Sequence, residues 1–470
     1  MLFNSFAFVT FFIVVTTLFF VLPHQLRWLM LLLASCFFYM FFVPYYIIIL
    51  VVTIIVDYLA GLWIEKTPNP RKKKLFLCMS IFSVCTMLFV FKYFNFFNAN
   101  FAALAAALHW NYSIEALSIA LPIGLSFHTF QSLSYVIEVY RGRQKAEHHL
   151  GVFALYVMYF PQLVAGPIER PQNLLHQFHE RKHFDLRRLQ DGLSLALWGL
   201  FKKVVVADSL AIYTDTIYDA SSHHTGASLL VATYCFAFQI YCDFSGYSDI
   251  ARGVSRVYGI ELMNNFDAPY LSKSISEFWT RWHISLSTWF RDYVYIPLGG
   301  NRVSPARNFL NLFFVFILSG FWHGANWTFI VWGALHGMYL IAERLWGIIR
   351  NRLNIPAESG LARQWLAALL TFHLVLIAWV FFRARDIATA FDIVRRMLTP
   401  TGQVFYDPIL VQCAIGALIV IVCDWLIRRT NFWDNLDRYP ATRFAACLAM
   451  LFGISLMGVE SGSQFIYFQF

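Results

Sequence analysis

The chain has 470 residues, of which 59% are hydrophobic, 19% aromatic and 13% charged, and its formal net charge is +9. Soluble domains carry about 25% charged residues, so this composition cannot supply polar surfaces for the two to four domains of a soluble protein of this length. With a mean hydropathy of +0.57, the chain is not a soluble enzyme with one anchor, a disordered protein or a secreted disulfide scaffold.

Apolar runs recur along the whole chain. A spanning helix needs roughly 20 mostly apolar residues, and the shorter runs are typical of re-entrant segments. The runs are continuous rather than alternating in polarity, which predicts helices and not a barrel. We expect an all-α polytopic membrane protein, one domain over residues 1–470, with about 9–13 membrane-embedded helices. The predicted segments are residues 2–22, 28–43, 45–64, 75–97, 119–140, 151–165, 193–207, 229–244, 309–322, 327–341, 365–382, 409–427 and 444–457.

The first apolar run differs from a signal peptide, because it has no basic residue before it and no A-x-A site before Pro23. Basic residues gather between the apolar runs, and under the positive-inside rule such clusters predict cytoplasmic loops. Three spans precede the first cluster, so the N-terminus is expected outside. Contact with anionic membrane lipids explains this charge better than nucleic acid does. The clusters are residues 71–74, 141–145, 181–188, 202–203, 344–352 and 428–429.

The stretch 264–307 is rich in both aromatic and polar residues, although strongly apolar runs precede and follow it. Between Phe278 and Tyr293, aromatic and leucine side chains recur at helical spacing beside a polar stripe. This pattern predicts a helix at the membrane interface, where Trp and Tyr are favoured. Ser274 or Ser276 is positioned to cap it, and the Pro-Leu-Gly-Gly sequence at 297–300 ends it.

One metal motif is present in the sequence. His179 to His183 spell H-E-x-x-H, in which two histidines one helical turn apart hold zinc. The motif lies among basic residues that repel a dication, and the sequence offers no clear third ligand. We therefore expect a solvated interfacial helix here and no metal site.

His323 is the leading candidate for chemistry, because ionisable groups inside membrane helices are costly and usually functional. Ser319 precedes it by four residues and Asn326 follows by three, so both share its face if the helix continues. A structural role is common for a lone buried histidine, but the flanking Gly320 and Gly324 leave room for a substrate.

His283 is the second candidate and His336 the third. On a continuous helix His336 lies about 20 Å from His323 and over 100° around the axis, so the two meet only if the helix breaks. A neutral imidazole can take a proton from a hydroxyl and return it to a leaving thiolate. This chemistry suits acyl transfer from a thioester to an alcohol, but it identifies neither substrate.

Several long motifs resemble the membrane-bound O-acyltransferase (MBOAT) family, and together they cover residues of about 120–340. The chain is most similar to the bacterial branch of alginate O-acetyltransferase AlgI and of the peptidoglycan and cellulose acetylation homologues, and less so to D-alanyl transferases (DltB). The motifs are FWTRWHISLSTWFRDYVYIPLGGNR at 278–302, SGFWHGANW at 319–327, WGALHG at 332–337, LPIGLSFHTFQ at 121–131, YFPQLVAGPI at 159–168 and DFSGYSD at 243–249.

The resemblance implies a helical bundle around a through-membrane tunnel. It implies that His323 is the family's invariant histidine, acting as base toward the acceptor hydroxyl, and that His283 occupies the second active-site position. Arg291 would approach the CoA phosphates, unless it only pairs with Asp292 or caps a helix. Supporting roles would fall to Trp282, Ser319, Asn326 and His336.

The resemblance also implies the substrates. Cytoplasmic acetyl-CoA would be the donor, with no bound cofactor, and the acceptor would be an exported cell-envelope polysaccharide, alginate above others. A periplasmic acetyl carrier or SGNH-type transferase would be the partner in the bacterial inner membrane. Transfer of D-alanine or another acyl group, and acetylation of peptidoglycan or cellulose, stay open. A transporter or flippase is a further alternative, although no inverted repeat with broken helices supports it.

Overall fold

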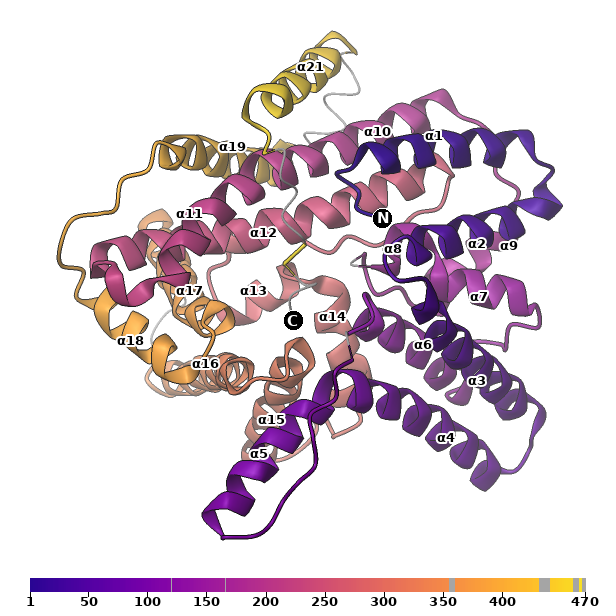
Figure 1. The fold of residues 1–470 in the computed structure, drawn as a ribbon, viewed down its shortest axis with the longest axis horizontal. Helices are drawn as coiled ribbons and strands as arrows, with labels where there is room; N and C mark the ends of the chain where they lie inside the picture. Colours follow the sequence, from indigo (N-terminus) through magenta and orange to yellow (C-terminus); the bar gives the residue numbers. More distant parts are fainter. Residues whose placement is uncertain (120, 165, 355–359, 431–439, 460–464, 467–470) are drawn as a thin grey trace. The chain divides into compact units, whose positions relative to one another are not determined.

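The computed structural model describes residues 1–119, 121–164, 166–354, 360–430, 440–459 and 465–466. Helices are the only regular secondary structure among these residues, which confirms the predicted all-α class (Figure 1). Ala120 and Ala165, each of which belongs to one of the predicted segments, lie outside the described residues. The chain forms two compact units, residues 1–196 with 248–263, and residues 197–247 with 264–470.

The first unit holds the N-terminal helices. Its core includes a buried carboxylate, Asp57 of α3, which accepts hydrogen bonds from Ser80 of α4 and Ser132 of α6. These bonds satisfy a charge that would otherwise be costly inside an apolar bundle. The helices are α1 (Phe6–Val21), α2 (His24–Met40), α3 (Ile47–Lys66), α4 (Pro70–Leu88), α5 (Phe94–Ala107), α6 (Leu125–Tyr140), α7 (Leu150–Met158), α8 (Phe160–Leu163) and α9 (Pro171–His179).

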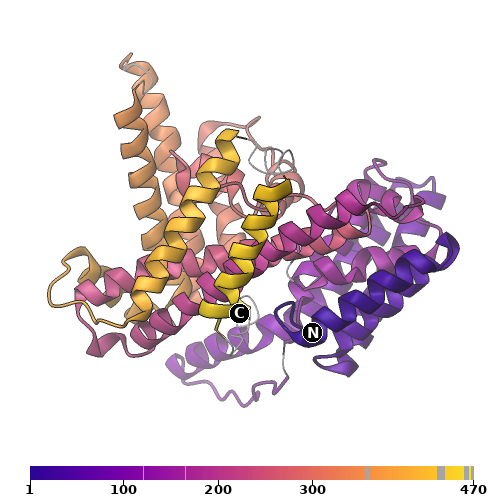
Figure 2. The ribbon, with the colours of Figure 1, turned by 90° about the horizontal axis from the view of Figure 1, so that it is seen from above.

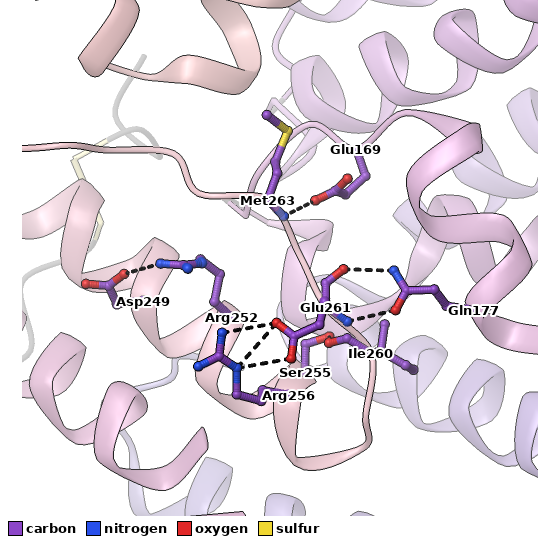
Figure 3. Close-up of polar contacts among 9 residues, drawn as sticks. All are labelled: Glu169, Gln177, Asp249, Arg252, Ser255, Arg256, Ile260, Glu261 and Met263. Carbon is purple, nitrogen blue, oxygen red and sulfur yellow. Dashed lines mark hydrogen bonds and ion pairs between the residues drawn. The ribbon is translucent and has the colours of Figure 1, made fainter. Parts of the chain in front are cut away.

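A polar network in the first unit holds the chain after α12 (Gly226–Val257), a helix that contributes residues to both units (Figure 3). Gln177 pairs with both backbone groups of Glu261, at 2.8 and 2.9 Å, and Arg256 forms an ion pair with the carboxylate of Glu261. Glu169 accepts a 2.5 Å hydrogen bond from the backbone N–H of Met263. Burial raises the pKa of Glu169 to about 7, against the opposing effect of nearby arginines. The segment that leads into residue 264 is therefore fixed by side chains.

The second unit contains the remaining helices, and α15 and α16 form an antiparallel hairpin within it (Figures 1 and 2). Glycines allow this close approach, because a Cβ on Gly320 would lie 2.2 Å from the carbonyl oxygen of Phe329, and one on Gly333 2.2 Å from that of Phe316. The helices are α11 (Asp208–Asp219), α13 (Ile275–Arg281), α14 (Ile284–Phe290), α15 (Pro305–His323), α16 (Trp327–Arg352), α17 (Leu361–Arg383), α18 (Ile387–Leu398), α19 (Ile409–Thr430) and α21 (Pro440–Met457), with α10 (Leu186–Phe201) shared between units.

Within the described ranges, five helical segments are long and apolar enough to cross a membrane. Two shorter apolar helices, Phe6–Val21 and Ala441–Met457, accompany them. The protein is therefore a multi-pass membrane protein, as its composition predicts. The five segments are Pro44–Lys66, Pro70–Ala107, Gly226–Val257, Leu361–Arg383 and Ile409–Arg428.

Two local predictions are wrong. Lys202 and Lys203 do not lie in a loop but are buried in a π-helical turn, η3 (Lys202–Ala207). Lys202 donates a 3.0 Å hydrogen bond to the hydroxyl of Ser245, and Lys203 forms 2.7 Å ion pairs with Asp208 and Asp243. The H-E-x-x-H motif is not a helix either, because α9 ends at His179 and the chain continues without helix through His183.

Candidate functional site

His283 lies at a break between two short helices. Ser274, one of the two predicted caps, accepts a 3.1 Å hydrogen bond from the backbone N–H of Glu277 and begins α13. His283 then adopts a left-handed conformation, with φ 44° and ψ 55°, and α14 begins at Ile284. The predicted single helix from Phe278 to Tyr293 is therefore wrong. The apolar stripe continues through the break and hides it, while the strained backbone marks His283 as a candidate functional residue.

Asn265 holds this turn through its backbone and its side chain. Its backbone carbonyl accepts a 3.0 Å hydrogen bond from the N–H of Ile284. Its side-chain Oδ1 lies 3.1 Å from the N–H of Ser285, 2.9 Å from Ser285 Oγ and 3.1 Å from His283 Nδ1. His283 is fully buried, and burial lowers its pKa to about 3, so the imidazole is neutral at pH 7.

His323 is the last residue of α15 and is 4% exposed. Its ring packs against Trp332 at 4.9 Å and Phe382 at 5.4 Å between centroids. Trp322 lies 4.8 Å from the His323 ring and 6.3 Å from the His283 ring. The structure thus brings the two predicted catalytic histidines to the same tryptophan, although 40 residues separate them in the sequence.

The helix that carries His323 ends before His336 begins another. Gly324 is the C-cap of α15, and Asn326 is the N-cap of α16, accepting a 3.0 Å hydrogen bond from the N–H of Thr328. The separation of His323 and His336 expected for one continuous helix therefore does not apply. After the reversal, Trp332 lies against both His323 and His336, at 4.9 and 5.0 Å.

The other predicted supporting residues separate into two kinds. Trp282 is 1% exposed and packs against Phe266 and Trp379 at 5.1 and 5.0 Å, so it belongs to the aromatic core beside His283. Asn326 does not share a helix face with His323, because the helix ends between them. Besides capping α16, its amide donates to the carbonyl of Arg385 at 3.1 Å.

A cavity of about 220 Å³ lies within the second unit, next to the elements that carry both histidines. Leu286 and Ser287, one turn after His283, and Ser319, one turn before His323, form part of its lining. The two imidazoles themselves are not in that lining. Most of the wall is apolar, and its polar groups are Ser276, Thr280, Ser287, Arg291, Tyr295 and Ser319.

Arg291 brings a cation to this cavity. Its side chain is 58% exposed, and it pairs with Asp292 through two hydrogen bonds of 2.8 and 3.2 Å. The sequence left two roles open for Arg291, and the structure shows pairing with Asp292 together with a place in the cavity wall. An apolar chamber with a guanidinium in its wall is compatible with a thioester ligand that carries anionic groups.

The part of the chain that the structure describes contains no group of three or more His, Cys, Asp or Glu residues arranged to hold a metal ion. His179 of the H-E-x-x-H motif instead lies 2.8 Å from Glu147, and Glu180 pairs with Lys182. The side chains near His283 and His323 are mostly aromatic and amide groups, and a proton-transferring imidazole is the chemistry that they support.

Sequence reasoning missed Asn265, Trp332 and Phe382. Asn265 precedes His283 by 18 residues, and no spacing rule joins the two, because the chain reverses through η5 (Pro269–Leu271) and α13 between them. Phe382 reaches His323 from α17, which is equally remote in the sequence. For Trp332, the available sequence signal was its place at the start of the WGALHG motif.

Comparisons with known proteins identify the family of the chain. Residues 146–385, just over half of the chain, match the model of the MBOAT, membrane-bound O-acyltransferase family. The chain belongs to this family. It is 32% identical to the peptidoglycan O-acetyltransferase of Helicobacter pylori over 469 residues, covering 89% of this chain and 86% of that protein.

Two further relatives align with a shorter part of the chain. The probable alginate O-acetylase AlgI of Pseudomonas aeruginosa is 46% identical over 281 residues, covering 60% of this chain and 52% of that protein. The teichoic acid D-alanyltransferase of Streptococcus thermophilus is 31% identical over 281 residues, covering 55% of this chain and 68% of that protein. This chain is thus an O-acyltransferase of the membrane, which disfavours the transporter alternative.

Proposed function

We propose that this protein passes an acetyl group from acetyl-CoA across the membrane toward hydroxyls of an exported cell-envelope polysaccharide, with alginate-type O-acetylation favoured. The observation that carries the proposal is the placement of His323 and His283 on the same tryptophan, beside a mostly apolar cavity with Arg291 in its wall. The 46% identity to a probable alginate O-acetylase supports this acceptor class.

The chemistry moves one proton from the acceptor hydroxyl to the departing thiolate. A histidine, in our proposal His323, takes the proton of the acceptor hydroxyl while the oxygen attacks the thioester carbonyl carbon. The carbon–sulfur bond then breaks, and the same proton passes to the departing thiolate, which leaves as the free thiol. His283 is neutral at pH 7 and its ring lies 6.3 Å from that of Trp322; in our proposal it shares in this proton transfer or positions the carbonyl.

Acetyl-CoA suits the cavity by its two kinds of surface. Its pantetheine arm is a slender chain that an apolar wall accommodates, while its phosphates suit the guanidinium of Arg291. Ser287 and Ser319 provide hydroxyls along the wall. The donor therefore approaches from the cavity side, and the acceptor hydroxyl must approach the same imidazoles.

The proposed setting is the bacterial inner membrane, with the N-terminus periplasmic and the donor on the cytoplasmic side. The basic clusters between the apolar runs support this orientation. A periplasmic acetyl carrier or SGNH-type transferase would receive the acetyl group and pass it to the polymer.

The decisive experiment measures the acetyl ester content of the exported polysaccharide in cells that produce His323→Ala at wild-type abundance. We expect acetylation to fall to background. His176→Ala is the matched control, because this histidine is exposed on α9 and lies outside the cavity. Undiminished acetylation by His323→Ala would refute the proposal.

A second candidate is transfer of D-alanine from a carrier protein, and the identity to a teichoic acid D-alanyltransferase is the observation that favours it. Purified protein offered radiolabelled acetyl-CoA or a D-alanyl thioester separates the two. Transfer of D-alanine alone, lost in His323→Ala, would replace the acetyl proposal with this one.

A further inference from the structure

We propose that Asn265 is a positioning residue for the transfer reaction: its side-chain carbonyl keeps the imidazole proton of His283 on Nδ1 and so places the lone pair on Nε2. This inference rests on the proposed function, in which His283 takes part in the proton transfer. Asn265 would then determine which of the two ring nitrogens of His283 can accept a proton.

The neighbouring backbone identifies the atom that faces His283. The N–H of Ser285 lies 3.1 Å from Asn265 Oδ1 and can only donate. The terminal atom of Asn265 at this position must therefore be the carbonyl oxygen, because an amide NH₂ would face another donor. The same oxygen is 3.1 Å from His283 Nδ1. Since an oxygen of this kind accepts, Nδ1 carries the proton and Nε2 carries the lone pair.

Asn265 also fixes the direction of the ring. It bonds to residues on both sides of the turn, through Ile284 N–H to its backbone carbonyl and through Ser285 to its side chain. A left-handed residue other than glycine costs about 1–3 kcal/mol and persists only where its surroundings hold it. The hydrogen bonds of Asn265 to Ile284 and Ser285 provide that support, and they also determine where Nε2 of His283 points.

The residues around His283 are neutral, so the tautomer of its ring determines which nitrogen can accept a proton. The ring is packed edge-on against Phe244 of α12 at 4.6 Å, and Phe266 and Trp322 lie 6.5 and 6.3 Å away. These rings and the side chains of Asn265 and Ser285 are neutral. Burial keeps the pKa of His283 at about 3, so the protonation state does not change near pH 7 and only the tautomer can vary.

The test uses full-length protein in lipid nanodiscs, with thiol release from acetyl-CoA measured in the presence of alginate oligomers. Asn265→Leu removes the acceptor, and we expect kcat to fall by about 10²-fold or more with little change in KM. Ser285→Ala is the matched control, because it removes a hydroxyl that lies 2.9 Å from Asn265 Oδ1 and 3.5 Å from His283 Nδ1 while the carbonyl oxygen of Asn265 stays in place. Asn265→Asp keeps an acceptor but adds a negative charge, which raises the pKa of His283. Its activity is therefore expected near wild type at pH 8 and to decline on acidification where wild type does not.

Nitrogen-15 NMR of the histidine-labelled protein, assigned with His283→Gln, reads the tautomer without using activity. We expect a protonated Nδ1 in wild type and a mixture in Asn265→Leu. A protonated Nε2 in wild type, or equal rates for Asn265→Leu and Ser285→Ala, would overturn the inference. If wild type shows the expected tautomer but releases no thiol above His323→Ala, the proposed function fails and the tautomer assignment stands.

Discussion

His283 and His336 are both fully buried histidines of the second unit, yet their surroundings place the ring proton on opposite nitrogens. At His283, the carbonyl oxygen of Asn265 receives the proton of Nδ1. At His336, the indole N–H of Trp279 donates to Nδ1 at 3.3 Å. Because an indole only donates, Nδ1 of His336 holds the lone pair and Nε2 holds the proton.

The difference shows that burial alone does not prepare a histidine for proton transfer. The lone pair of His336 is engaged by Trp279, and its Nε2 is buried without a hydrogen-bond partner among the described residues. Its ring stacks on Phe278 at 6.2 Å with an interplanar angle of 4°. We infer that His336 packs the aromatic core, while His283 carries its lone pair on Nε2.

Replacing each ring in turn tests whether the two histidines differ in function. His283→Ala removes a group in the proton path, and we expect transfer to fall by about 10²–10⁴-fold. His336→Gln keeps a hydrogen-bond acceptor for Trp279, and we expect its activity to remain close to wild type. Rates of thiol release, normalised to folded protein by size-exclusion chromatography, measure both. Equal losses in the two variants would show that the two histidines do not differ in function.

A sequence pattern predicts the features that depend on neighbouring residues along the chain. The helical, membrane-embedded class followed from the length of the apolar runs, and each predicted segment contains a helix. His283 and His323 were found because costly ionisable groups stand out near apolar runs. The break at His283 was not found, because hydrophobic periodicity records which face is buried and not where the backbone turns left-handed.

Partners remote in the sequence were equally out of reach. Lys203 was assigned to a loop under the positive-inside rule, but Asp208 and Asp243 pair with it inside a helix. Asn265 meets His283 only after the chain reverses through two short helical elements. Such pairings depend on tertiary packing, which a single sequence does not display.

The hairpin that places Trp332 between His323 and His336 provides the next test. Gly333→Ala would put a Cβ 2.2 Å from the carbonyl oxygen of Phe316, so we expect a loss of about 1–3 kcal/mol in stability from overpacking. Gly347→Ala is the control on the same helix, because no atom lies within 4 Å of the Cβ it would add. Thermal unfolding in detergent measures both. A Gly333→Ala variant as stable as Gly347→Ala would show that the close helix approach is not needed.

The segment that leads to Asn265 gives a test through pH. Burial raises the pKa of Glu169 to about 7, above its ordinary value of 4.5. A raised pKa in the folded state favours the protonated carboxyl, so the stability it contributes is present below pH 4.5 and is lost as pH rises toward 7. We expect the Tm of wild type to fall from pH 5 to pH 8 more steeply than that of Glu169→Gln. Glu261→Gln, which alters an exposed carboxylate of the same network, should keep the wild-type slope. Equal slopes in wild type and Glu169→Gln would refute the assignment.

Replacing Arg291 is expected to change donor binding slightly and to leave proton transfer unchanged. Because this side chain is largely exposed and paired with Asp292, its contact with a donor phosphate is worth about 0–1 kcal/mol, which corresponds to a change in KM of up to about 5-fold. Arg291→Ala should raise KM for acetyl-CoA and leave kcat unchanged, whereas His283→Ala should lower kcat. Acetyl-pantetheine, which lacks the phosphates, serves as the control donor, and its KM should not respond to Arg291→Ala. An equal rise in KM for both donors would mean that Arg291 shapes the cavity wall and does not recognise phosphate.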